Sequence, residues 1–181
     1  MNVTVFCASS DTIPRHYIIE AQEMAGLLSE YGHTLVYGGG STGIMGIMAD
    51  IMLANRAKVK GVIPRFMVEV EWQHKRVSDM ELTETMEERK QRLIELADVI
   101  LVLPGGVGTL DEMFMAICNY KLKLHNKEII ILNTEGIYTP IQELLLRMDE
   151  EHFLSPSGLQ GISFVKTPAE VIEVIKQIRR K

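Results

Sequence analysis

Short apolar segments rich in β-branched residues alternate with longer amphipathic segments along the chain. Several of the short segments are apolar without any alternation, as expected of strands covered on both faces of a sheet. Six such strands are expected, at 3–8, 34–37, 59–63, 99–103, 129–133 and 162–165. Strands that alternate with helices predict an α/β fold built on a parallel sheet.

The amphipathic segments predict helices at 15–30, 44–55, 84–97, 109–124, 139–150 and 168–179. In the last segment, apolar residues recur at i, i+3, i+4 and i+7, and Pro168 falls in the first turn, where its missing N–H does no harm. We therefore expect a Rossmann-like, doubly wound parallel sheet in a single domain spanning residues 1–181. The stretch 64–82 has no clear period and is expected to be a loop region near the carboxyl ends of strands.

Charge and composition exclude several classes of protein. The formal net charge is −5 and the basic clusters are short, so no nucleic-acid partner is expected. No apolar run is long enough for a membrane span, and no export signal is seen. Cys7 and Cys118 lack metal-ligand spacing, as do the five histidines, so we expect no metal site and a cytoplasmic, reducing setting.

Eight of the fourteen glycines fall in two clusters, each placed after a predicted strand and before a predicted helix. The clusters lie at 38–46 and 105–108. Glycine lets backbone N–H groups approach a ligand closely, and a helix presents its positive end to an anion. Two sites for phosphate-type groups are therefore possible.

The first cluster matches G-x-G-x-x-G, the dinucleotide-binding pattern. It follows the second strand rather than the first, and no acidic residue ends the next strand, so tight strand-to-helix packing is an equal explanation. The second cluster has no following lysine and is not a nucleoside-triphosphate P-loop, but it suits a single phosphate.

Two groups of residues each leave two interpretations open. Thr109 and Glu112 have the spacing of a helix capping box, so Glu112 is either a capping residue or a catalytic carboxylate. Arg89, Lys90 and Arg92 form either a solvated helix face or part of an anion site.

Residues 104–112, PGGVGTLDE, resemble the PGGxGTxxE motif of the LOG ("Lonely Guy") family, the cytokinin riboside 5′-monophosphate phosphoribohydrolases. Four further segments are similar to motifs of that family. They are MEERK at 86–90 (M-x-x-R-K), VYGGGSTGIMG at 36–46 (VYGGGxxGLMG), FCASS at 6–10 (YCGSS) and GVIP at 61–64 (GxxP). The resemblance spans residues 3 to about 140, most of the chain.

The resemblance implies a cofactor-free enzyme, usually a homodimer, that cleaves adenine-type nucleoside 5′-monophosphates to free base and ribose 5-phosphate. Arg89 and Glu112 correspond to the catalytic residues of the family. The implied substrate- and phosphate-binding residues are Gly105, Gly106, Val107, Gly108, Thr109, Lys90, Gly39, Gly40 and, by spacing, Glu71. Cleaving the bond from C1′ to nitrogen creates an oxocarbenium-like sugar, which a carboxylate such as that of Glu112 stabilises.

The sequence departs from the family over 119–128, where the tryptophan, glutamine, glycine and proline of W-x-Q-L-G-x-H-x-K-P are absent. This difference bears on the base pocket or a subunit contact, so the preferred nucleobase stays open. Two other functions stay open. The same loops would also serve a non-catalytic carrier of a nucleotide or phosphorylated cofactor, or a dinucleotide-dependent oxidoreductase. Nothing in the sequence suggests the pyridoxal phosphate site of a lysine decarboxylase, a label often attached to this family.

Overall fold

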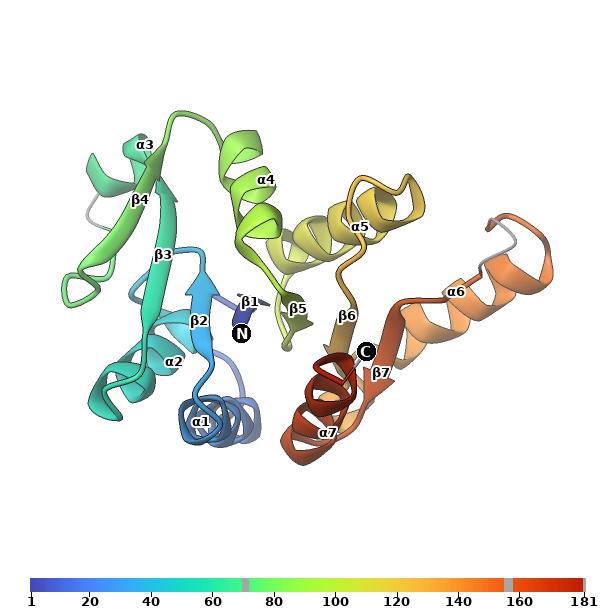
Figure 1. The fold of residues 1–181 in the computed structure, drawn as a ribbon, viewed down its shortest axis with the longest axis horizontal. Helices are drawn as coiled ribbons and strands as arrows, with labels where there is room; N and C mark the ends of the chain where they lie inside the picture. Colours follow the sequence, from blue (N-terminus) through green and yellow to red (C-terminus); the bar gives the residue numbers. More distant parts are fainter. Residues whose placement is uncertain (70–71, 155–157, 181) are drawn as a thin grey trace.

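A seven-stranded parallel sheet forms the centre of the computed structural model, which describes residues 1–69, 72–154 and 158–180 (Figure 1). The strand order is β4-β3-β2-β1-β5-β6-β7, and every neighbouring pair is parallel. The strands are β1 (Asn2–Phe6), β2 (Thr34–Tyr37), β3 (Val59–Pro64), β4 (Asp79–Thr83), β5 (Val99–Val102), β6 (Ile129–Leu132) and β7 (Ile162–Val165). The expected α/β, Rossmann-like fold is confirmed.

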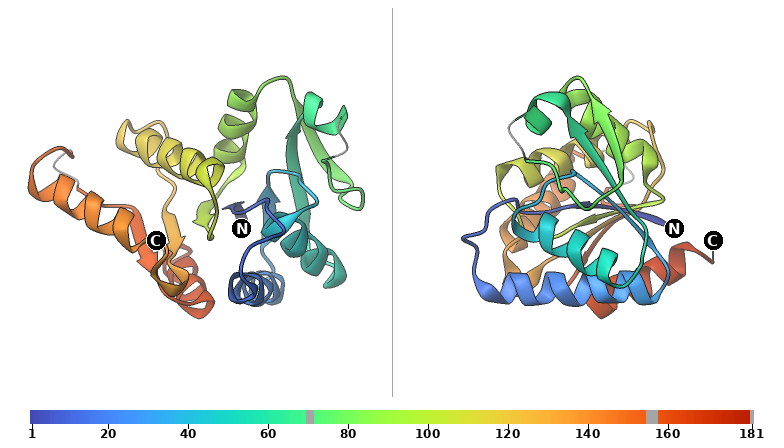
Figure 2. Two further views of the ribbon diagram at one scale, coloured as in Figure 1. Left: turned by 180° about the vertical axis from the view of Figure 1, so that it is seen from behind. Right: turned by 90° about the vertical axis from the view of Figure 1, so that its left-hand side faces the viewer.

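Helices cover both faces of the sheet, as Figures 1 and 2 show. Helices α1 (Arg15–Glu30), α2 (Gly43–Ala54) and α7 (Pro168–Ile178) pack on one face, and α4 (Met86–Leu96) and α5 (Val107–Lys121) pack on the other. The remaining helical segments are α3 (Arg65–Glu69), the 3₁₀ turn η1 (Thr134–Gly136) and α6 (Thr139–Glu150). The sheet is therefore doubly wound.

Strands β5 and β6 are uniformly apolar because both of their faces are buried. In β5, Val99 and Leu101 pack toward α1, α2 and α7, whereas Ile100 and Val102 pack toward α4 and α5. All four side chains are fully buried. Each contributes roughly 1.5–3 kcal/mol of hydrophobic stabilisation. Because its alternate residues belong to the two core clusters on opposite faces of the sheet, β5 joins the two halves of the core.

The expectation that 64–82 is a loop region was wrong at two places, α3 and β4. β4 lies at one edge of the described sheet, beside β3. Its Asp79 and Glu81 carboxylates lie 3.0 and 3.3 Å from the Lys60 ammonium of β3. An edge strand can carry charged side chains that a central strand does not tolerate. The sequence of β4 therefore lacks the apolar pattern of a buried strand and was interpreted as a loop.

The strand order reverses between β1 and β5, and this switch point places the ends of both strands beside a crevice. The Ala8 N–H, just after β1, donates to the Pro104 carbonyl, just after β5, at 3.1 Å. The two glycine clusters follow β2 and β5, at this same edge of the sheet. No helix in the described parts of the chain is both long and apolar enough to cross a membrane.

Candidate active site

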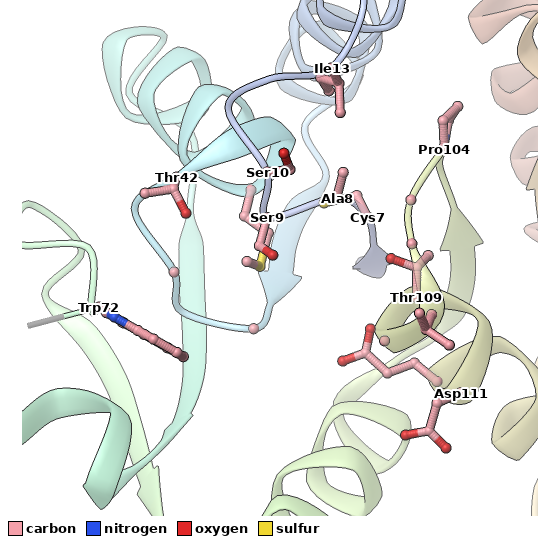
Figure 3. A pocket seen from close by; sticks show the side chains of 18 of the residues that line it. Cys7, Ala8, Ser9, Ser10, Ile13, Thr42, Trp72, Pro104, Thr109 and Asp111 are labelled. Atoms are coloured by element: carbon pink, nitrogen blue, oxygen red, sulfur yellow. The ribbon is translucent and has the colours of Figure 1, made fainter. Parts of the chain in front are cut away.

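A cavity of about 840 Å³ lies at the carboxyl edge of the sheet, between the loops that follow β1, β2 and β5 (Figure 3). It brings together segments that are far apart in the sequence: the 6–10 segment, both glycine clusters and the start of α4. The sequence-predicted residues that line it are Gly40, Arg89, Lys90, Gly105, Gly106, Val107, Gly108, Thr109 and Glu112.

A buried ion pair joins the two facing helices at this cavity. The Arg89 Nη1 on α4 donates to Glu112 Oε1 on α5 at 2.8 Å, and the two residues are only 6% and 9% exposed. Two backbone carbonyls also accept from the same guanidinium, Val62 O from Nε at 3.2 Å and Gly38 O from Nη2 at 3.3 Å. The solvated-face interpretation is therefore wrong for Arg89.

Gly38 makes room for this guanidinium. A Cβ at position 38 would lie 1.8 Å from the Arg89 Nη2, closer than any real contact. The first glycine of the first cluster is thus needed because a side chain from another helix approaches the backbone there. This is a packing role, and it directly supports the charged pair.

The capping-box interpretation of Glu112 is also wrong. Helix α5 begins at Val107 with Gly106 as its N-cap, so Thr109 is the third helical residue and Glu112 lies in the second turn. Because α5 begins at Val107, two residues before the predicted start at 109, Glu112 does not cap the helix and its carboxylate pairs with Arg89 instead. A capping box is present instead on α4, where the Thr85 hydroxyl accepts from the Glu88 N–H at 3.1 Å.

The amino end of α5 faces the cavity without a side-chain cap from the described residues. Its backbone turns tightly over Thr109, since a Cβ on Gly105 would lie 2.1 Å from the Thr109 Oγ1. Val107 is 84% exposed. This end of α5 therefore offers backbone N–H groups and the positive end of the helix dipole to an anion.

The amino end of α2, after the first glycine cluster, is different. Asp11 Oδ1 accepts a hydrogen bond from the Gly43 N–H at 2.7 Å. A carboxylate of the chain itself thus caps this helix. Sequence analysis missed Asp11; its acidic side chain directly follows the 6–10 segment, but only the fold brings it to α2.

The other predicted site residues have separate environments. Lys90 Nζ pairs with Asp111 Oδ2 at 3.0 Å, and Asp111 lines the cavity beside Glu112. Gly39 does not line the cavity; its carbonyl accepts from the His74 N–H at 2.8 Å. Glu71 lies outside the described residues.

Burial controls the ionisation of two groups in the cavity wall. Desolvation raises the pKa of Glu112, and the positive charge of Arg89 opposes this shift. Desolvation, together with the charge of Glu112, raises the pKa of the Cys7 thiol well above its ordinary value. Cys7 therefore remains a neutral, weakly nucleophilic thiol. Among the described residues, no three His, Cys, Asp or Glu side chains gather into a group that could hold a metal ion.

Comparison with known proteins places these motifs in a family. The family described as "Possible lysine decarboxylase" matches residues 45–175. A probable cytokinin riboside 5′-monophosphate phosphoribohydrolase of Oryza sativa subsp. japonica is 34% identical over 175 residues, covering 97% of this chain and 72% of the relative. The chain belongs to the LOG family. A second LOG relative, a cytokinin riboside 5′-monophosphate phosphoribohydrolase of Arabidopsis thaliana, is 30% identical over 97% of this chain and 81% of its own length.

Solved structures share the fold of this LOG-family chain. The molybdenum cofactor binding protein of Rippkaea orientalis has a TM-score of 0.76 at 19% identity, over 98% of this chain and 96% of that chain. The molybdenum cofactor carrier protein of Chlamydomonas reinhardtii has a TM-score of 0.77 at 17% identity, over 99% of this chain and 98% of that chain. At these identities the likeness shows a common architecture.

Proposed function

We propose that this chain hydrolyses the N-glycosidic bond of adenine-type nucleoside 5′-monophosphates to free base and ribose 5-phosphate, without a cofactor. The observation that carries the proposal is the buried Arg89–Glu112 pair beside the amino end of α5, which no described side chain caps, in one cavity. The activity named for the LOG relatives supports the same reaction.

The 5′-phosphate binds at the start of α5 in this proposal. Backbone N–H groups of Gly105, Gly106, Val107, Gly108 and Thr109 and the helix dipole favour an anion there. The equivalent end of α2 is already capped by Asp11, so the α5 end is the better phosphate site of the two. Binding the phosphate away from the reacting bond holds the ribose in place and favours monophosphates over nucleosides.

Glu112 then acts at C1′. As the bond from C1′ to the base nitrogen breaks, its electron pair leaves with the base and positive charge develops on the sugar, which a carboxylate stabilises. Water attacks C1′ and gives a proton to Glu112, while the departing base nitrogen takes a proton from solvent. Glu112 then releases its proton to solvent and is ready for the next turnover. Arg89 orients the carboxylate and favours its ionised form.

The test is Glu112→Gln, with Glu95→Gln on the exposed side of α4 as the matched control. Glutamine can still accept from Arg89 but cannot carry the negative charge or take the proton. We expect base and ribose 5-phosphate release from AMP and isopentenyladenosine monophosphate to fall roughly 10²- to 10⁴-fold in Glu112→Gln only. Monophosphates that bind the wild type without any base release would overturn hydrolysis in favour of a carrier.

The protein is further proposed to be a cytoplasmic homodimer. Leu122 and Leu124, just after α5, are 69% and 70% exposed, an apolar surface that a second subunit would cover. Both cysteines are unpaired, which suits a reducing compartment. Sedimentation of the wild type and of Leu124→Glu checks the dimer, because the variant should be monomeric.

A further inference from the structure

Trp72 lies in the cavity wall opposite the start of α5. Figure 3 shows its indole projecting toward the cavity from the side away from Pro104 and Thr109. The residue is 57% exposed, so an aromatic face remains open to a ligand. It is also the single tryptophan of the sequence.

Backbone pairing fixes the position of this tryptophan. The Ser41 N–H donates to the Trp72 carbonyl at 3.1 Å, and the His74 N–H donates to the Gly39 carbonyl at 2.8 Å. Between these bonds, Gly40 and Gln73 form an antiparallel bridge. Segment 72–74 thus lies as a short strand along the first glycine cluster.

A partly buried side-chain contact holds the same segment to α2. His74 is 6% exposed, and its Nε2 lies 2.9 Å from Asp50 Oδ1. The Asp50 carboxylate also contacts the Arg76 guanidinium. The indole is therefore mounted on a fixed support rather than on a freely moving loop.

The two ends of the cavity differ in chemistry. The α5 end offers N–H groups and the charged pair. At the other end the Trp72 N–H donates to the Met67 carbonyl at 3.0 Å. Met45 and the Trp72 backbone both lie against Gly40, so two apolar side chains line the cavity near the indole. A nucleoside monophosphate has the same polarity, with a phosphate at one end and a flat aromatic base at the other. Bases stack well on indole rings because each has a π-face.

We infer that Trp72 is the stacking platform for the base, an inference that rests on the proposed nucleotide substrate. With the phosphate at the start of α5 and C1′ at Glu112, the base extends toward Trp72. Met67 and Met45 border it with flexible apolar surface, which also suits an alkyl group on the purine.

The first experiment follows the fluorescence of Trp72 in the Glu112→Gln protein, in which turnover is suppressed. AMP should quench the emission with the same Kd that calorimetry gives, because the stacked purine contacts the indole. Ribose 5-phosphate, which lacks a base, should bind by calorimetry and leave the emission unchanged.

The second experiment compares Trp72→Ala and Trp72→Phe with Phe66→Ala, an exposed aromatic residue of α3 outside the cavity lining. We expect Trp72→Ala to weaken AMP binding and raise KM roughly 5- to 150-fold, the loss of one stacking contact. Trp72→Phe should recover much of the lost AMP affinity, because phenylalanine keeps an aromatic face. The affinity for ribose 5-phosphate should be unchanged in all three variants.

The outcomes separate this inference from the proposed hydrolysis. AMP that binds without quenching, or with the same Kd in Trp72→Ala, overturns the stacking role even if hydrolysis proceeds. AMP that quenches the emission but is never cleaved by the wild type overturns hydrolysis and leaves the stacking platform standing. If AMP does not bind at all, both are wrong.

Discussion

Replacing Arg89 by methionine tests how strongly the buried pair is coupled to folding. The substitution keeps most of the side-chain volume but removes the guanidinium that bonds to Glu112, Val62 and Gly38. Glu112 would then be a buried carboxylate without its partner. Removing one member of a buried pair costs about 3–5 kcal/mol, which for a chain of this length lowers Tm by roughly 6–20 °C.

The penalty should depend on pH, because Glu112 can escape it by taking up a proton. Without Arg89, the pKa of Glu112 in the folded variant rises further above its unfolded value. At low pH the carboxyl is protonated in both states and the variant should approach the wild type. The difference should widen as pH rises from about 5 to 7, since ionisation is then disfavoured only in the folded state.

Urea unfolding of wild type and Arg89→Met across this pH range measures the effect. Arg92→Met, one turn further along α4, is the matched control, because its ion pairs are partly exposed and contribute about 1 kcal/mol at most. In a Glu112→Gln background the Arg89→Met cost should shrink. A difference below about 1 kcal/mol, or one that is constant with pH, would refute the reasoning.

Two pH effects should also be measurable. Burial raises the pKa of Glu112 above about 4.3, the ordinary value for glutamate. As pH falls, kcat/KM should therefore begin to drop before about pH 4.3 is reached. A kcat/KM that stays constant down to below that pH would contradict this. Burial, with Glu23 and Glu135 nearby, raises the pKa of Glu20 to about 7, so the folded state binds that proton more tightly than the unfolded state. Stability from Glu20 should be complete below about pH 4.3 and lost as pH rises to 7, and denaturation of Glu20→Gln should show a flatter pH dependence.

The buried strands were predictable from the sequence because both of their faces are apolar. Ile129 to Leu132, for example, is a continuous apolar run, and its alternate residues pack on opposite sides of the sheet. β4 escaped prediction because it borders the sheet, where Asp79 and Glu81 bind Lys60 rather than the core. The hydrophobic pattern identifies a strand only where the fold buries it.

The glycine clusters and the charged positions pointed to the site, but their roles depended on the fold. Thr109 and Glu112 have the same i, i+3 spacing whether they cap a helix or lie inside it, and the start of α5 at Val107 decides between the two. The bonds from Arg89 to Val62 and Gly38 join residues 27 and 51 positions apart. Local patterns carry no information about such distant contacts.

Asp11 shows that a glycine-rich turn before a helix is not by itself a phosphate site. The two turns have similar sequences, yet the end of α2 donates to the Asp11 carboxylate of a neighbouring loop, whereas no described side chain caps the end of α5. The chain thus supplies an internal competitor for one of its two anion positions. Counting glycine motifs therefore overestimates how many phosphates such a protein can hold. Whether such a turn can bind a phosphate also depends on acidic residues elsewhere in the chain, as Asp11 shows for α2. A substitution there would change phosphate binding while every glycine stays in place.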